Sequence, residues 1–226
     1  MIAVVGLAVA LAAWAAGCGS GNDDGTDAAR RTRVPDRLNS IEEATEDIID
    51  IVPANRWNDI AKDVREIDSS WSSYQDRAVD DGADADLVAR LTESLTNLRA
   101  AAGAQKGPET AQAANDVSAA TVELFGLYKT GRPIDIGRLD VLGRQVVLDV
   151  ERGDLGAASA EVTKVDSIWK GGLRDDVVAH QGRAVADRTD TVLTAIDRAA
   201  TSADGSTLVG QTKVFLEEVD AMERVY

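Results

Sequence analysis

The sequence has very few of the residues that metal proteins and enzymes use for chemistry. It contains one cysteine and one histidine among 226 residues, too few for a disulfide within the chain or for a typical zinc, copper or haem site. It also has no glycine-rich phosphate loop, no Gly-x-Ser-x-Gly elbow and no Ser/His/Asp arrangement. We therefore predict no metal site and no other cofactor, and we expect the protein not to be an enzyme.

Aromatic residues and prolines are also scarce. Aromatics make up 4% of the chain, and only four prolines occur. Beyond residue 35 each proline stands at a predicted break between helices: Pro53, Pro108 and Pro133. Alanine and valine supply most of the apolar content. This composition is typical of an all-α protein.

Positive charge is in short supply as well. The chain has 24 Lys and Arg against 39 Asp and Glu, a formal net charge of −15. Binding to nucleic acid needs a basic patch that neutralises phosphates, so we expect no nucleic-acid partner. The same charge disfavours a domain that lies flat on anionic lipid.

The longest apolar run is too short to cross a membrane. Residues 2–16 carry no charge, whereas a spanning helix needs about 20 apolar residues. The run leads into Ala15-Ala16-Gly17-Cys18, and this motif resembles the lipobox of bacterial lipoproteins. Ala15 stands where leucine is more usual, and no basic residue precedes the run. The resemblance implies cleavage after Gly17 and attachment of lipid to the Cys18 thiol.

The first 35 residues are then interpreted as a targeting and tethering region. Residues 1–17 are the predicted signal peptide, and residues 18–35 are a lipidated cysteine followed by a polar, glycine-rich, flexible linker. Acyl chains on Cys18 would anchor the protein in the lipid bilayer of the cell membrane, facing the extracytoplasmic side. The alternative is that Cys18 is one buried small residue of an N-terminal helix.

The remainder of the chain is an internal repeat with an offset of 98 residues. Identical residues recur at this offset without a gap, and apolar positions between them correspond by type. The identical pairs include Val52/Val150, Val64/Val162, Asp68/Asp166, Ser69/Ser167, Trp71/Trp169, Val79/Val177, Arg90/Arg188, Leu95/Leu193 and Tyr128/Tyr226. We infer a duplication, with repeat 1 over residues 36–130 and repeat 2 over residues 131–226.

Each repeat is predicted to form four helices. In repeat 1 the apolar spacing indicates helices over residues 38–52, 57–74, 87–102 and 117–128, and residues 155–173 form the second helix of repeat 2. Short loops favour antiparallel neighbours, so we predict two four-helix bundles in tandem. One eight-helix array is the alternative. Gly107 and Gly205 are predicted to close the third helices, and Asn55 and Asp154 to cap the second ones.

The repeated Asp-Ser-x-Trp motif provides the candidate ligand site. Asp68 and Trp71 in repeat 1 match Asp166 and Trp169 in repeat 2. One interpretation is a ligand cleft with an indole wall and a neighbouring carboxylate. The other is that each indole fills the core of its bundle while the aspartate faces solvent. Both Trp residues lie on the apolar stripe of their helix, which favours the core.

His180 is the single histidine. The sequence places Asp176 one helical turn before it, but repeat 1 has Gly82 at the position of His180. We therefore expect a surface histidine near a helix junction. Residues 153–219 also resemble an uncharacterised family of small extracytoplasmic helical domains of Gram-positive bacteria, which implies a helical fold and a location outside the cytoplasm.

These observations favour a non-catalytic binding or scaffold module that recruits a protein of the cell envelope. The alternative is a carrier for a small ligand or a cation. A scaffold should expose an apolar patch of several hundred Å² on its helices. A carrier should have an internal pocket lined by the indoles, and an enzyme would need carboxylates buried together with perturbed pKa values.

Overall fold

The computed structural model describes residues 33–226, and these residues form an all-α fold without strands. Repeat 1 contains α2 (Asp36–Ile51), the one-turn η1 (Val52–Ala54), α3 (Trp57–Asp80), α4 (Ala85–Gly103) and α5 (Gly107–Phe125). Repeat 2 contains α6 (Ile134–Glu151), α7 (Leu155–Ile168), η2 (Trp169–Leu173), α8 (Arg174–Ala179), α9 (Arg183–Thr201) and α10 (Gly205–Glu223). Since α7, η2 and α8 follow one another without a loop, they are counted as one helix with a kink at Gly172, and the described residues form eight helices.

The helix boundaries confirm the repeat. Each main helix of repeat 2 begins 98 residues after its counterpart in repeat 1. The same 98 residues separate Glu46 from Arg144, two side chains that form a hydrogen bond between the repeats. Thus α6 matches α2, α7 to α8 match α3, α9 matches α4 and α10 matches α5. The same apolar spacing therefore produces the same set of helices twice.

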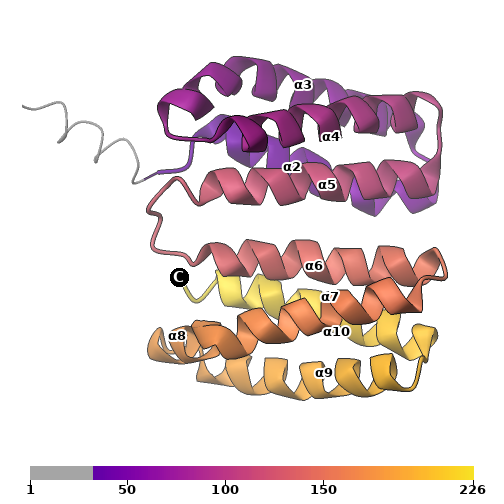
Figure 1. Cartoon of the computed structure of the whole chain (residues 1–226), viewed down its shortest axis with the longest axis vertical. Helices are drawn as coiled ribbons and strands as arrows, with labels where there is room; N and C mark the ends of the chain where they lie inside the picture. The colour runs from indigo at the N-terminus through magenta and orange to yellow at the C-terminus, as the bar shows by residue number, and fades with distance from the viewer. Residues whose placement is uncertain (1–32) are drawn as a thin grey trace, which may run out of the picture. The chain divides into compact units, whose positions relative to one another are not determined.

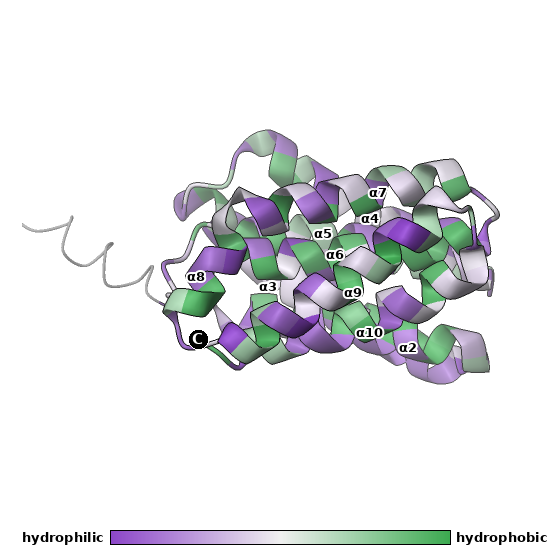
Figure 2. Cartoon of the chain, turned by 90° about the horizontal axis from the view of Figure 1, so that it is seen from below, coloured by the Kyte–Doolittle hydropathy of each residue, from purple (hydrophilic) through white to green (hydrophobic). Residues whose placement is uncertain are grey.

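Each repeat encloses its own hydrophobic core. The first core is built almost entirely from α2 to α5, and its fully buried members include Ile41, Ile67 and Leu91. The second core is built from α6 to α10 and includes Leu139, Trp169 and Phe215. Figure 2 shows hydrophobic and hydrophilic residues alternating around the helices, the pattern that buries one side of each helix.

The two repeats meet along α5 and α6, which lie side by side in the centre of Figure 1. Close approach of these helices depends on Gly137, because a Cβ there would lie 3.1 Å from the Val122 side chain. The described residues belong to one compact unit. The fold therefore consists of two four-helix bundles that pack together into one set of eight helices. The eight helices are compatible with both predicted arrangements, the tandem bundles and the single array.

The helix ends confirm one predicted cap and correct another. Asp154 caps α7, since its Oδ1 accepts a hydrogen bond from the Ala157 backbone N–H at 2.9 Å. Asn55 does not cap α3. It has a left-handed conformation (φ 53°) and ends η1, while Arg56 holds the N-cap position.

Gly107 and Gly205 were predicted to end helices, and this was wrong, because they are the first residues of α5 and α10. The preceding turns use Gln105 and Ala203 in the left-handed conformation instead. Gly205 is required for space, since a Cβ there would lie 3.1 Å from Val150. Close packing between helices thus accounts for Gly205, whereas a Cβ at Gly107 would make an ordinary contact with Val52 at 3.6 Å.

Repeat 2 departs from repeat 1 at one turn of its second helix. The helix predicted over residues 155–173 is interrupted by the π-helical turn η2, in which Gly172 has φ 132°. In repeat 1 the matching α3 continues without a break for 24 residues. None of the helices among residues 33–226 is both long and apolar enough to span a bilayer.

Candidate functional site

The two tryptophans of the repeated motif are core residues. Trp71 and Trp169 are almost completely buried, at 3% and 1% exposure. Trp71 Nε1 donates a hydrogen bond to Thr92 Oγ1 (3.3 Å), and Trp169 Nε1 donates one to Asp190 Oδ1 (2.8 Å). Thr92 and Asp190 are equivalent positions of the repeat, so the same contact occurs twice. Neither indole lines a groove described below, and this supports the core interpretation.

The aspartates of the motif do not converge with the indoles on a ligand cleft. Asp68 forms a salt bridge with Arg99 between α3 and α4, at 2.7 Å from Nε to Oδ1. Asp166 pairs with Lys170 within its own helical segment. Both are ordinary ion pairs at the surface.

His180 lies where the sequence predicted, at the junction after α8. Its side chain is half exposed, its Nδ1 is 2.9 Å from the Asp176 carbonyl oxygen, and its ring packs against Tyr226 with centroids 4.6 Å apart. It therefore stabilises the C-terminal end of the fold. Cys18 and the predicted signal peptide and most of the linker lie outside the described residues.

Charged residues from both repeats meet in a cluster that sequence reasoning missed. Glu42 and Glu46 come from α2, and Asp140 and Arg144 from α6. One oxygen from each of the three carboxylates lies within 4.8 Å of the others. Arg144 Nη2 is 2.5 Å from Glu46 Oε1 and 2.5 Å from Asp140 Oδ2. We call these four residues the axial cluster.

The axial cluster pairs equivalent residues of the repeat. Glu42 matches Asp140, and Glu46 matches Arg144, each at the offset of 98 residues. The helices that carry them, α2 and α6, run in the same direction (Figure 1). Contacts between equivalent residues are typical of the two-fold axis of a homodimer. The repeats therefore meet here much as two subunits would, with three carboxylates and one guanidinium on the axis.

Burial perturbs the protonation of the cluster. Desolvation, reinforced by the negative charge of Glu46, raises the pKa of Glu42 from 4.5 to about 8 although Arg144 opposes the shift. Desolvation likewise raises the pKa of Asp140 from 3.8 to about 7. Glu223 of α10 has a raised pKa for the same main reason. The single guanidinium therefore does not balance the acidic groups around it.

Two polar atoms of the cluster are sealed from solvent without a partner. Ser118 Oγ on α5 donates to Glu42 Oε1 at 3.1 Å, but Glu42 Oε2 has no hydrogen-bond partner. Arg144 Nη1 is in the same state. Such atoms are uncommon in folded proteins, because a buried polar group without a partner costs free energy.

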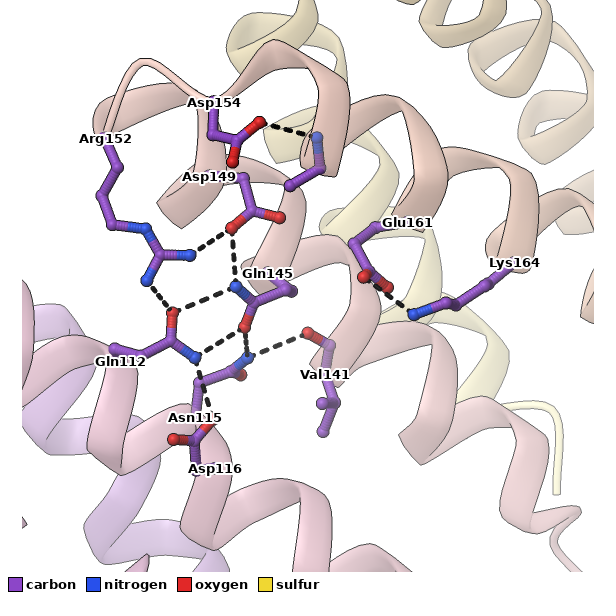
Figure 3. A network of polar contacts seen from close by, with 11 residues as sticks. Gln112, Asn115, Asp116, Val141, Gln145, Asp149, Arg152, Asp154, Glu161 and Lys164 are labelled. Atoms are coloured by element: carbon purple, nitrogen blue, oxygen red, sulfur yellow. Dashed lines mark hydrogen bonds and ion pairs between the residues drawn. The ribbon is translucent and has the colours of Figure 1, made fainter. Parts of the chain in front are cut away.

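A polar network joins α5 to α6 (Figure 3). The side-chain amides of Gln112 and Gln145 bond reciprocally, at 2.9 and 3.0 Å. Asn115 Nδ2 donates to Gln145 Oε1, and Gln145 Nε2 donates to Asp149 Oδ1. Arg152 pairs with Asp149 at the end of α6. These specific bonds set the register between the repeats.

An apolar groove crosses the contact between the repeats. It measures about 480 Å³ and is lined by α5, α6 and α7, with mostly apolar walls from Ala119, Val122, Val141, Leu142 and Ile168. Its charged rim residues are paired: Arg138 with Glu123, and Lys164 with Glu161. A second groove of about 540 Å³ lies between the α2–α5 and α6–α10 pairs, and Arg144 contributes to its wall.

Few large apolar side chains are highly exposed on the described residues. Among large hydrophobic residues, Val79 on α3 and Val214 on α10 are the exposed ones, at 57% and 40%. These two side chains lie on different helices, and the groove on α5, α6 and α7 is the mostly apolar surface feature that joins the two repeats. Comparison of the chain with family models, curated proteins and solved structures gave no match.

Proposed function

We propose that this protein is a lipid-anchored bacterial lipoprotein that acts outside the cytoplasm as a non-catalytic module for binding an envelope protein. Cys18 holds it to the membrane, and the groove on α5, α6 and α7 receives the partner. The groove is the single observation that carries the proposal, because it is an open, mostly apolar surface built from both repeats.

The occupant that fits this groove is an amphipathic helix of the partner. Such a helix can lay its apolar face between ridges of side chains on the three helices that form the walls. Arg138 and Lys164 stand at the rim and provide polar contacts to its solvated side. The network around Gln145 holds α5 and α6 in one register, so the groove is formed before the partner arrives.

Binding is favoured over catalysis by the position of the perturbed carboxylates. Glu42 and Asp140 meet the requirement for buried acids with raised pKa values. However, they line neither of the two grooves described above, and Arg144 alone of the axial cluster reaches one. These carboxylates therefore support a cation or proton site better than a substrate site.

Site-specific photo-crosslinking in the native membrane tests the proposal. A photo-reactive amino acid at Thr163, on the groove wall, should capture one envelope protein that mass spectrometry identifies, and Ala119→Glu should abolish the capture by placing a charge in the groove. The same photo-reactive amino acid at the exposed Val79 is the control, and it should not capture the protein that is captured from position 163. Equal capture from both positions would contradict the proposal, as would retention of Cys18→Ser protein in the membrane.

A further inference from the structure

We propose that Glu42, Glu46 and Asp140 bind one divalent cation of the Ca²⁺ type at the contact between the two repeats. The inference goes beyond the binding of a protein partner and does not depend on it. The sequence predicted no metal site, because the ligands come from α2 and α6 and are brought together only by the packing of the repeats.

The donor set suits a hard cation. All three ligands are carboxylates, and oxygen ligands are those that Ca²⁺ and Mg²⁺ prefer. One oxygen of each lies within 4.8 Å of the others, close enough to share one ion. Mg²⁺ keeps several waters and is usually held by one or two carboxylates, whereas Ca²⁺ accepts several protein carboxylates in flexible geometry. Three protein carboxylates therefore favour Ca²⁺.

The charge around the site is unbalanced toward the negative. Arg144 faces three carboxylates from α2 and α6, and α10 adds Asp220 and Glu223, which act on Asp140 through space. Arg132 pairs with Glu223 at the edge of this group. A divalent cation would supply the positive charge that one guanidinium does not.

The sealed oxygen of Glu42 is a second and independent indication. Ser118 fixes the orientation of the carboxylate through Oε1, while Oε2 is excluded from solvent and accepts no hydrogen bond. A desolvated carboxylate oxygen without a donor is costly unless a proton or a cation occupies it. Arg144 does not fill this role, because its Nη1 is also sealed without a partner.

Arg144 is the member of the cluster that forms part of the wall of the 540 Å³ groove. The proposed ion takes the place of its guanidinium between Glu46 and Asp140. The ion would then join α2 to α6 and tie one repeat to the other. Binding is therefore expected to stabilise the packing of the repeats as well as the cluster itself.

The experiment measures Ca²⁺ binding to the full-length lipidated protein in detergent, first treated with EDTA. Isothermal titration and thermal unfolding with Ca²⁺ should show one site and a rise in Tm, with Mg²⁺ at least tenfold weaker. Glu42→Gln and Asp140→Asn should each weaken Ca²⁺ binding at least tenfold. Glu43→Gln, one residue away on the exposed side of α2, is the matched control and should bind as the wild type does.

Three results would overturn the proposal. The first is a wild-type protein that shows no Ca²⁺ binding and no Ca²⁺-dependent rise in Tm. The second is an equal loss in Glu43→Gln, which would indicate a diffuse effect of the acidic surface. The third is Ca²⁺ binding to Arg144→Gln but not to the wild type, which would show that the guanidinium permanently holds the cation position. Circular dichroism of each variant separates loss of binding from loss of the fold.

Discussion

Glu46 and Arg144 hold equivalent positions in the two repeats, 98 residues apart, and form an ion pair with each other at 2.5 Å. One copy of the repeat thus carries the anion and the other the cation at the same position. A pairing of this kind is possible only because divergence after duplication made the two copies different. It makes Arg144 the residue on which the electrostatic balance of the contact depends.

Arg144→Met is expected to destabilise the protein by about 3–5 kcal/mol at pH 8, because removing one partner of a buried ion pair leaves uncompensated charge. The buried pair is the one with Asp140, since both side chains are 13% exposed, whereas Glu46 is 44% exposed. Urea unfolding measures the free energy. Arg99→Met is the control, since its pair with Asp68 is 45% and 31% exposed and should contribute about 0–1 kcal/mol. Equal losses in the two variants would contradict the prediction.

In the presence of EDTA, the free energy of unfolding should fall as the pH rises from 5 to 9. An acid whose pKa is raised by folding keeps its proton in the folded state at pH values where the unfolded chain has released it. For Glu42 the stabilisation is complete below the ordinary pKa of 4.5 and is lost as the pH rises through about 8. Urea unfolding at several pH values gives the slope, and Glu42→Gln should make it shallower. If Glu42→Gln leaves the pH dependence of the free energy of unfolding unchanged, then groups other than Glu42 cause that dependence.

Gln145→Ala is expected to weaken the contact between the repeats by about 1–3 kcal/mol, because it removes one hydrogen bond from each of the buried side chains of Asn115 and Asp149 and the reciprocal pair with Gln112. Hydrogen exchange should become faster in α5 and α6. Gln75→Ala on the outer helix α3 serves as the matched control and should leave exchange in these helices unchanged. Unaltered exchange in Gln145→Ala would mean that apolar packing alone fixes the register.

Trp71→Phe and Trp169→Phe should each lower the free energy of unfolding by about 1–3 kcal/mol, because both indoles fill buried space and donate a hydrogen bond. Chemical unfolding measures the loss. Trp57, which is only partly buried, should tolerate the same substitution at lower cost. A small ligand whose binding shifts the emission of Trp71 or Trp169 would contradict the assignment of these residues to the core.

Much of the helical pattern was predictable because it depends on local and periodic features. Apolar residues at helical spacing define which side of each helix is buried, and the offset of 98 residues predicts that the set of helices occurs twice. The cap at Asp154 followed from the same local rules. The turns before Gly107 and Gly205 were misread because Gln105 and Ala203 take the left-handed conformation there, where a local rule expects glycine.

The axial cluster could not be read from the sequence. The repeat register pairs Glu42 with Asp140 and Glu46 with Arg144, but register alone does not say that equivalent residues touch. Carboxylates on helices are usually solvated, and no local motif distinguishes Glu42, Glu46 and Asp140 from the other acidic residues. Burial between the two repeats removes their water and raises the pKa of Glu42 and Asp140.

The sequence by itself thus determined the helices, their duplication and the two apolar cores. Burial of apolar surface is the dominant driving force of folding, and the apolar residues that are buried recur at helical spacing along the sequence. It also carries the Ala15-Ala16-Gly17-Cys18 motif on which the predicted anchor rests. Only the tertiary structure decided how the repeats meet, and therefore where charge is buried. The reason is physical: desolvation and pairing depend on distances between residues 98 positions apart, which packing alone sets.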